Sequence, residues 1–300
     1  MASSRNETVT GVGLALGGIF SVQIGAALAT PIFERIGPAA TAWLRLCWAA
    51  AIFLAIARPR LSKLPRRDLA SAAALGFVSA ANSMMFFEGI ARIPLATVVA
   101  IEFLGPLGVA VWHRSGPWGL AWPPLAFAGV LLVTEPWHGD INLVGVLLAL
   151  GAGVGWGAYI LLTQRVGDRF HGIAGLSIAM PVAALAATPV GAFQAWGRVD
   201  GISLLLCAGL ALLFPVASYS LELNALRKLD TATFGTLMSI EPAAALLVGA
   251  VGLHQIPDAG QVLGVLFVTI AAIGAARTGQ REIPAAPEST RSMNADALPK

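Results

Sequence analysis

Charged residues are scarce in this chain of 300 residues, where they make up only 12% of the sequence while hydrophobic residues make up 57%. Because about a quarter of the residues in a soluble domain are charged, this composition excludes that class. Only two cysteines are present, Cys47 and Cys207, and both fall within apolar runs. The sequence therefore offers neither a disulfide framework nor a zinc site, and we expect a membrane protein without metal or other cofactor.

Patterns typical of enzymes and of nucleic-acid-binding proteins are also missing. No aspartate lies inside an apolar run, the four histidines fall in loops or at helix ends, and no Gly-x-Ser-x-Gly motif occurs. This argues against an intramembrane protease or lipid transferase. The net charge is +3, but the basic residues do not alternate with aromatic residues on one face, as a nucleic-acid site would require. We expect neither an enzyme nor a nucleic-acid-binding protein.

Long apolar runs dominate the sequence instead. A helix of about 20 apolar residues crosses the hydrocarbon core of a bilayer, which is roughly 30 Å thick. The sequence therefore predicts an all-α membrane protein with ten transmembrane helices. They are expected near residues 10–30, 38–57, 69–90, 95–112, 119–134, 142–162, 173–193, 202–221, 232–252 and 260–276.

Basic residues are distributed unevenly between the loops of this topology. Cytoplasmic loops accumulate lysine and arginine because these residues are translocated poorly. With a cytoplasmic N-terminus, the inner segments hold 15 of the 19 basic residues, and the outer loops hold only Arg35, Arg92 and Arg198. Arg45 alone lies inside a helix. We therefore predict that both termini are cytoplasmic.

Two stretches of the chain are related in sequence. Arg92 and Pro106 in the first stretch match Lys228 and Pro242 in the second, both at a spacing of 136 residues. Each half then contains five helices, and an odd number forces the two halves into opposite orientations. The sequence thus predicts an inverted-topology repeat with a pseudo-two-fold axis in the membrane plane. The expected parts are an N-terminal segment (1–9), a first repeat (10–134), a second repeat (142–278) and a disordered tail (279–300).

Two glutamates fall inside predicted helices, each close to a proline. Glu102 lies four residues before Pro106, and Glu241 directly precedes Pro242. An ionisable group at this depth is costly unless it is functional or paired, and proline loosens the helix around it. We predict that both glutamates belong to a site for substrate binding or proton coupling. The alternative is a structural ion pair with Arg45.

Other candidates for this site are weaker, because each has an ordinary structural explanation. Arg45 is expected to pair with a glutamate, to meet a substrate carboxylate or to reach toward the membrane surface, and pairing is favoured. Glu88 and Glu222 fall at predicted helix ends, where we expect them to be solvated. The remaining candidates serve helix packing equally well, and they are Gln23, Asn82, Trp156, Tyr159, Tyr219 and Ser239.

Three runs carry a resemblance to a known group of proteins. Residues 21–26 (SVQIGA), 101–107 (IEFLGPL) and 233–242 (TFGTLMSIEP) resemble the drug/metabolite transporter superfamily, and they are most similar to the threonine/homoserine exporters of the EamA family. The similarity extends over nearly all of residues 10–278. It implies a secondary active exporter of small neutral amino acids in a bacterial inner membrane, driven by protons and working by alternating access.

The resemblance leaves alternatives open. Many members of the family carry a Gly-Glu pair after the ninth helix, whereas this chain has His254-Gln255, so substrate preference is expected to differ. Export of another metabolite or of a drug is the alternative within the superfamily. We expect the partners to be a small-molecule substrate and membrane lipid. A substrate zwitterion would place its ammonium group toward Glu102 or Glu241 and its carboxylate toward Arg45 or amide donors.

Overall fold

The computed structural model describes residues 2–57, 65–112, 121–135, 142–167, 170, 174–226, 228–229 and 231–278, and the regular secondary structure in these segments is helical. The predicted tail, 279–300, lies outside these segments. In chain order the helices are α1 (Ala2–Ile36), α2 (Pro38–Ala57), α3 (Arg66–Ile90), α4 (Leu95–Glu102), α5 (Leu104–Trp112), α6 (Trp122–Thr134), α7 (Leu143–Gly167), α8 (Ala174–Ala195), α9 (Gly201–Ala211), the π-helical turn η4 (Leu212–Ala217), α10 (Ser218–Leu226), α11 (Thr231–Met238), α12 (Glu241–Gly252) and α13 (Ala259–Thr278).

Within the described segments, eight helical stretches are long and apolar enough to cross a membrane. Two further apolar stretches, Leu95–Val109 and Trp122–Thr134, are shorter. All ten predicted apolar runs are thus helical where they are described, although the first helix is longer than expected. The start predicted for the fifth helix, 119, lies outside the described segments. This helix begins at Trp122, and Pro123 and Pro124 occupy its first turn, where a missing N–H is tolerated.

Two of the predicted helices are broken in the middle. The predicted helices 95–112 and 232–252 are helical apart from one or two turn residues in each. The first is interrupted at Phe103, between α4 and α5, and the second at Ser239 and Ile240, between α11 and α12. Each break lies just before a proline, Pro106 or Pro242. Because proline has no N–H, the carbonyl four residues earlier loses its helical partner.

A third interruption, which the sequence did not predict, lies in the eighth apolar run between α9 and α10. The backbone at Phe214 is extended, with φ −143° and ψ 112°, and Pro215 follows it. The freed carbonyl groups accept hydrogen bonds from other helices. Ser21 donates to the Leu213 carbonyl at 2.8 Å, and Arg45 donates to the Phe214 carbonyl at 3.3 Å. Irregular backbone inside a bundle is stable when such partners satisfy it.

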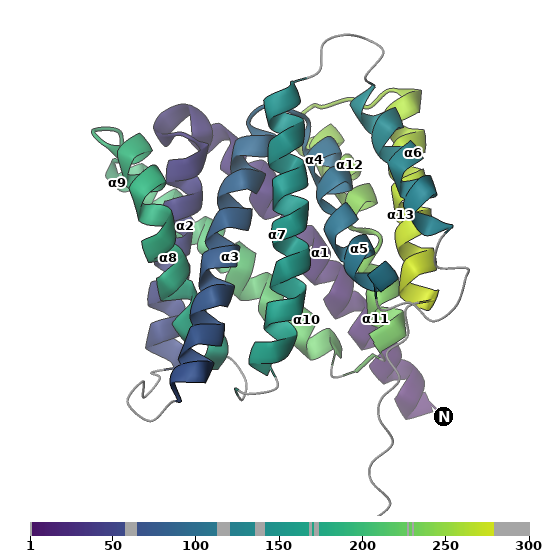
Figure 1. Cartoon of the computed structure of the whole chain (residues 1–300), viewed down its shortest axis with the longest axis horizontal. Helices are drawn as coiled ribbons and strands as arrows, with labels where there is room; N and C mark the ends of the chain where they lie inside the picture. The colour runs from purple at the N-terminus through teal and green to yellow at the C-terminus, as the bar shows by residue number, and fades with distance from the viewer. Residues whose placement is uncertain are drawn as a thin grey trace, which may run out of the picture.

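Helices of the first half and helices of the second half pack against each other. Helix α1 contacts α10, α11 and α12, while α7 contacts α3, α4 and α5. In addition, α2 packs against α8, α6 against α13, and α4 against α12. Figure 1 shows α2, α8 and α9 at one side of the molecule and α6 with α13 at the other. Helices α1 and α7 thus each contact three consecutive helical segments of the other half, and α2 and α6 each pack against the helix about 136 residues further along the chain.

Large apolar side chains cover the outside of the bundle. Val154, Leu185, Leu205 and Val251, on four different helices, have exposed fractions of 72–75%. Such a surface is unfavourable in water but matches hydrocarbon. The chain is therefore a multi-pass membrane protein.

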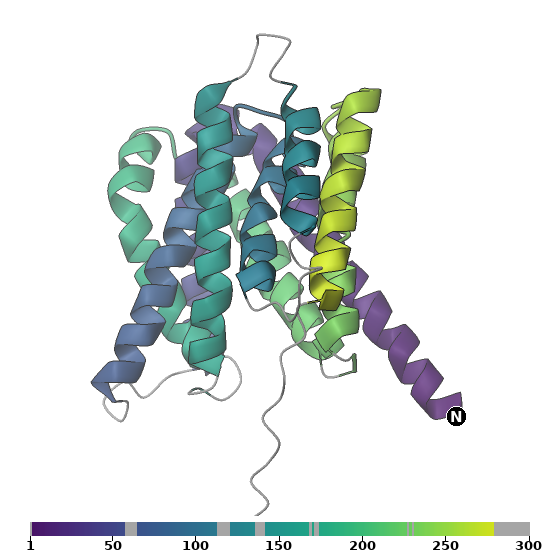
Figure 2. The same ribbon diagram turned by 45° about the vertical axis from the view of Figure 1, so that its right-hand side comes forward.

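The two ends of the bundle differ in charge. Helices α1 and α3 begin, and α7 and α13 end, at the same end of the bundle, which we call the N-terminal end (Figures 1 and 2). Arg66 and Arg67 open α3, while Arg165 and Arg277 lie in the last turns of α7 and α13. The opposite end carries Arg35, in the last turn of α1.

Candidate functional site

A cluster of buried polar side chains lies at the level of the broken helices. Gln23, Arg45, Glu102 and Glu241 have exposed fractions of 7% or less. Glu102 is the last residue of α4, and Glu241 is the first residue of α12. The two breaks therefore place the two predicted carboxyl groups in the interior of the bundle. We call Gln23, Arg45, Asn82, Glu102 and Glu241 the central cluster.

Asn82 connects Glu102 to two other helices. With its amide oriented to satisfy both neighbours, Asn82 donates to Glu102 Oε1 at 3.1 Å and accepts from the backbone N–H of Trp156 at 3.3 Å. The Trp156 ring also meets the Phe103 ring edge to face, with centroids 5.4 Å apart. Asn82 and Trp156 thus hold the end of α4 against α3 and α7.

Glu241 is held on the other side of the cluster by α1. Gln23 Nε2 donates to Glu241 Oε1 over 3.4 Å. Within the described segments, Gln23 Oε1 and Glu241 Oε2 are buried without a hydrogen-bond partner. A buried polar atom without a partner is costly. Either oxygen would therefore favourably accept a hydrogen bond, and the Glu241 carboxylate oxygen would also favourably bind a proton.

Among the described residues, Arg45 forms no ion pair with a glutamate, so the favoured prediction for this residue is wrong. Its guanidinium donates to Ser83 Oγ at 2.8 Å and to the Phe214 carbonyl, and it lies between the rings of Phe87 and Phe214, 4.8 and 4.3 Å from their centroids. Among the described residues, Arg45 Nε has no hydrogen-bond partner. Two aromatic faces and a carbonyl stabilise the cation in place of a carboxylate.

Helix α3 contacts both Arg45 and Glu102 and explains why the two do not pair. Asn82 contacts Glu102, and the next residue, Ser83, contacts Arg45. Neighbouring residues of a helix point about 100° apart, because the helix has 3.6 residues per turn. Helix α3 therefore contacts the cation and the carboxyl group through adjacent residues that point in different directions.

The prediction that Glu222 lies at a helix end is wrong. The residue was expected to be solvated, but the eighth apolar run continues as α10 to Leu226, and Glu222 is only partly exposed. It interacts electrostatically with Tyr159, Tyr219 and Glu241. Its position three residues after Tyr219 indicates that both side chains share one face of the helix. That spacing could have identified it from the sequence.

The predictions for Ser239 and Glu88 have different outcomes. Ser239 is buried at the break between α11 and α12, but its hydroxyl donates to the Gly235 carbonyl at 2.9 Å, inside its own segment. That bond does not link it to the central cluster. Glu88 is partly exposed, forms an ion pair with Arg92 and accepts from Gln194 at 3.4 Å, so it stabilises the end of the bundle opposite the N-terminal end.

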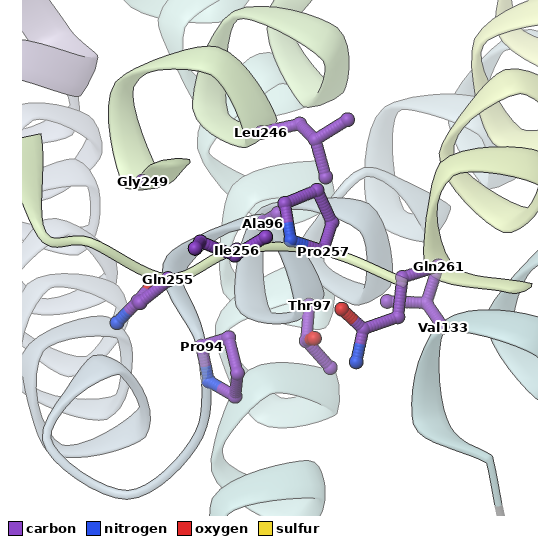
Figure 3. A pocket seen from close by; sticks show the side chains of 10 residues that line it. All are labelled: Pro94, Ala96, Thr97, Val133, Leu246, Gly249, Gln255, Ile256, Pro257 and Gln261. Carbon is purple, nitrogen blue, oxygen red and sulfur yellow. The ribbon is translucent and has the colours of Figure 1, made fainter. Parts of the chain in front are cut away.

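A cavity of about 180 Å³ lies at that opposite end, between α4, α12 and the segment that leads into α13. Figure 3 shows Thr97 of α4 and Gln261 of α13 pointing toward each other across it. Gln255 Oε1 accepts from the backbone N–H of Leu95 at 3.0 Å, which is the first residue of α4. The neutral Gln255 therefore caps α4 here, and all the side chains that line the cavity are uncharged.

A helical bundle with an apolar outer surface and buried polar side chains near interrupted helices is an architecture found in membrane transporters. No group of three His, Cys, Asp or Glu side chains that would hold a metal ion occurs in the described segments. The chain belongs to the EamA-like transporter family, whose family model matches residues 143–277.

Curated relatives agree with this assignment. The chain is 35% identical over 265 residues to the threonine/homoserine exporter RhtA of Escherichia coli (strain K12) and to that of Salmonella typhimurium (strain LT2), and the match covers 87% of this chain and 90% of each relative. A solved crystal structure shares the fold with a TM-score of 0.61 at 18% identity, over 88% of this chain and 96% of the other. The resemblance found in the sequence is confirmed.

Proposed function

We propose that this protein exports small neutral amino acids, such as threonine and homoserine, from the cytoplasm by proton-coupled alternating access. The observation that carries the proposal is the identity of 35% over 87% of the chain to threonine/homoserine exporters. The central cluster supports it independently, because it combines a buried cation with two buried carboxyl groups.

A zwitterionic amino acid complements this cluster. In the proposed complex the substrate carboxylate approaches Arg45, whose Nε has no partner, and the ammonium group approaches Glu241 Oε2, which also has none. Charge-assisted hydrogen bonds of this kind are among the strongest in proteins. The rings of Phe87 and Phe214 stack on the planar guanidinium and hold it in place, so the cation is oriented before the substrate arrives.

The matched packing of the two halves supports a ten-helix inverted repeat. The breaks at Phe103 and Ser239 lie 136 residues apart, as do the two prolines that cause them. In transporters of this kind the substrate site lies at the repeat interface, near broken helices, and the halves move against each other. We propose that the bond between Gln255 and Leu95 helps to close the end opposite the N-terminal end.

The charge of the two ends supports an orientation with both termini in the cytoplasm of a bacterium. The N-terminal end carries Arg66, Arg67, Arg165 and Arg277 among the described residues. Because cytoplasmic loops accumulate arginine and lysine, we propose that this end faces the cytoplasm. The end closed by Gln255 then faces outward, and export proceeds from the arginine-rich end to that one.

Transport by purified protein in liposomes tests the proposal. Labelled threonine and homoserine, with a panel of other amino acids, are offered with and without an imposed pH gradient. We expect gradient-driven accumulation of the small neutral amino acids. If a glutamate couples transport to protons, replacing it, in Glu102→Gln or in Glu241→Gln, should abolish this accumulation while protein levels stay unchanged. The matched control is Glu34→Gln, which changes an exposed glutamate on α1.

Two results would contradict the proposal. If both single variants keep gradient-driven transport, neither glutamate couples transport to protons. If no amino acid is transported while another metabolite or a cationic drug is, the cargo is the alternative one within the superfamily.

A further inference from the structure

Glu222 is a carboxyl group that the proposed substrate site does not use. Its side chain packs on Gly18 of α1, where an added Cβ would lie 3.1 Å from Glu222 Cγ and 3.5 Å from Oε1. Within the described segments, the Glu222 carboxyl group takes part in neither of the two ion pairs, Arg35–Asp200 and Arg92–Glu88. It is thus a partly buried acid in an apolar bundle, without an ion-pair partner among the described residues.

The position of Glu222 along the bundle is fixed by α1. Gly18, which it contacts, precedes Gln23 by five residues, and Gln23 is the residue that bonds Glu241. At a rise of 1.5 Å per residue, Gly18 lies roughly 7 to 8 Å closer to the N-terminal end than Gln23 does. Glu222 therefore lies between Glu241 and the N-terminal end of the bundle, a region that α1 and α10 line together in Figure 1.

The titratable groups around Glu222 come from three helices. They are Glu241 of α12, Tyr159 of α7 and Tyr219 of α10 itself, and each interacts with it electrostatically. Helix α1 presents Gly18, which has no charge. Glu241 also interacts electrostatically with Glu102. Two neighbouring carboxyl groups in a low dielectric resist being ionised together, so protons on Glu102, Glu241 and Glu222 are coupled along a chain.

We propose that Glu222 is the residue through which Glu241 exchanges protons with the N-terminal side of the membrane. The inference rests on the proposed proton coupling and extends it. A proton bound on Glu241 while the site is open to the outside passes to Glu222 and then to the cytoplasm. Glu241 is left ionised and binds the substrate ammonium group. One proton enters on the outer side for each proton released on the inner side, and no other reactant is needed.

The test separates exchange from coupling in liposomes that contain the full chain. Threonine exchange at equal pH on both sides requires substrate binding and alternation but no net proton movement. Accumulation driven by a pH gradient requires proton release. A pH-sensitive dye inside the liposomes reports this proton movement while accumulation is measured. For Glu222→Gln we expect exchange close to that of the unchanged protein and a loss of gradient-driven accumulation of at least about tenfold.

Two further variants serve as controls for Glu222→Gln. Glu222→Asp retains a carboxyl group and should restore part of the coupling, while Glu34→Gln repeats the charge change at an exposed position and should behave like the unchanged protein. Size-exclusion elution in detergent shows that each variant is folded.

Each result decides a different claim. Full coupling in Glu222→Gln overturns the role of Glu222, and so does an equal loss of exchange and coupling, because that marks a binding or structural residue. An unchanged protein that exchanges threonine without any response to a pH gradient overturns the proposed proton coupling itself.

Discussion

At the scale of single residues, Arg45 shows how a membrane protein can bury a cation without an ion pair. Two aromatic rings, a hydroxyl and a carbonyl freed by the break at Phe214 replace the carboxylate. The arrangement uses the planar guanidinium, which bonds along its edge while its faces stack. It also leaves Nε without a hydrogen-bond partner among the described residues.

Arg45→Lys should weaken substrate binding although the charge is kept. A lysine ammonium is compact and does not stack between two rings while bonding Ser83 and the Phe214 carbonyl. We expect the KM for threonine to rise by about tenfold, equivalent to about 1.4 kcal/mol. Transport kinetics in liposomes would show this, with the exposed Arg198→Lys as the control. An unchanged KM would contradict a role of Arg45 in binding the substrate.

Asp200, which lies outside the membrane-spanning segments, carries a carboxyl group whose pKa is lowered by its neighbours. Hydrogen bonding from Ser203, followed by the nearby Arg35 guanidinium, lowers the pKa of Asp200 from 3.8 to about 2. A lowered pKa stabilises the folded state above the ordinary value, and this contribution is lost only as the pH falls through about 2. The contact between Arg35 and Asp200, 2.6 Å long, is therefore charged throughout the physiological range.

Asp200→Ala should lower the melting temperature in detergent by the same amount at about pH 5 and about pH 8, because Asp200 does not titrate between them. Removing this residue also removes the cap of α9, in which Asp200 accepts from the Ser203 N–H at 2.8 Å. Thermal unfolding followed by tryptophan fluorescence provides the measurement. A destabilisation that disappears at the lower pH would mean that Asp200 is protonated there.

At the scale of helices, the position of α5 depends on close contact with α7. A Cβ added at Gly105 would lie 1.9 Å from the Gly153 carbonyl oxygen, and at Gly153 it would lie 2.9 Å from the Glu102 carbonyl oxygen. Only glycine permits this approach of two backbones. The contact lies directly beside the break that holds Glu102, so helix packing and the position of the carboxyl group are linked.

Gly105→Ala should destabilise the protein by about 1–3 kcal/mol, because the new methyl group meets backbone that must shift. Gly108→Ala is the matched control on the same helix, since no atom lies within 4 Å of a Cβ there. We expect a lower melting temperature and slower transport for the first variant and neither change for the second. Equal behaviour of the two variants would show that the close contact of α5 and α7 does not matter.

At the scale of the whole molecule, the sequence was sufficient for the helices and the family but not for their interruptions or partners. Apolar runs predict helices because lipid forces every backbone group to bond internally. The break at Phe103 follows from Pro106, whereas the choice of Ser83 and Phe214 as partners of Arg45 depends on how distant helices pack. The same holds for Glu222, whose surroundings come from α1, α7 and α12. Local pattern alone does not specify such contacts.

The orientation of the molecule can be tested with one cysteine at each end of the bundle. In a Cys47→Ala, Cys207→Ala background, Gly201→Cys changes an exposed position at the start of α9, and Ala70→Cys changes one near the start of α3. Because the arginine-rich end is expected in the cytoplasm, a membrane-impermeant maleimide should label intact spheroplasts at position 201 and not at position 70. Permeabilised spheroplasts should be labelled at both positions. The reverse pattern in intact spheroplasts would invert the topology and, with it, the direction of transport.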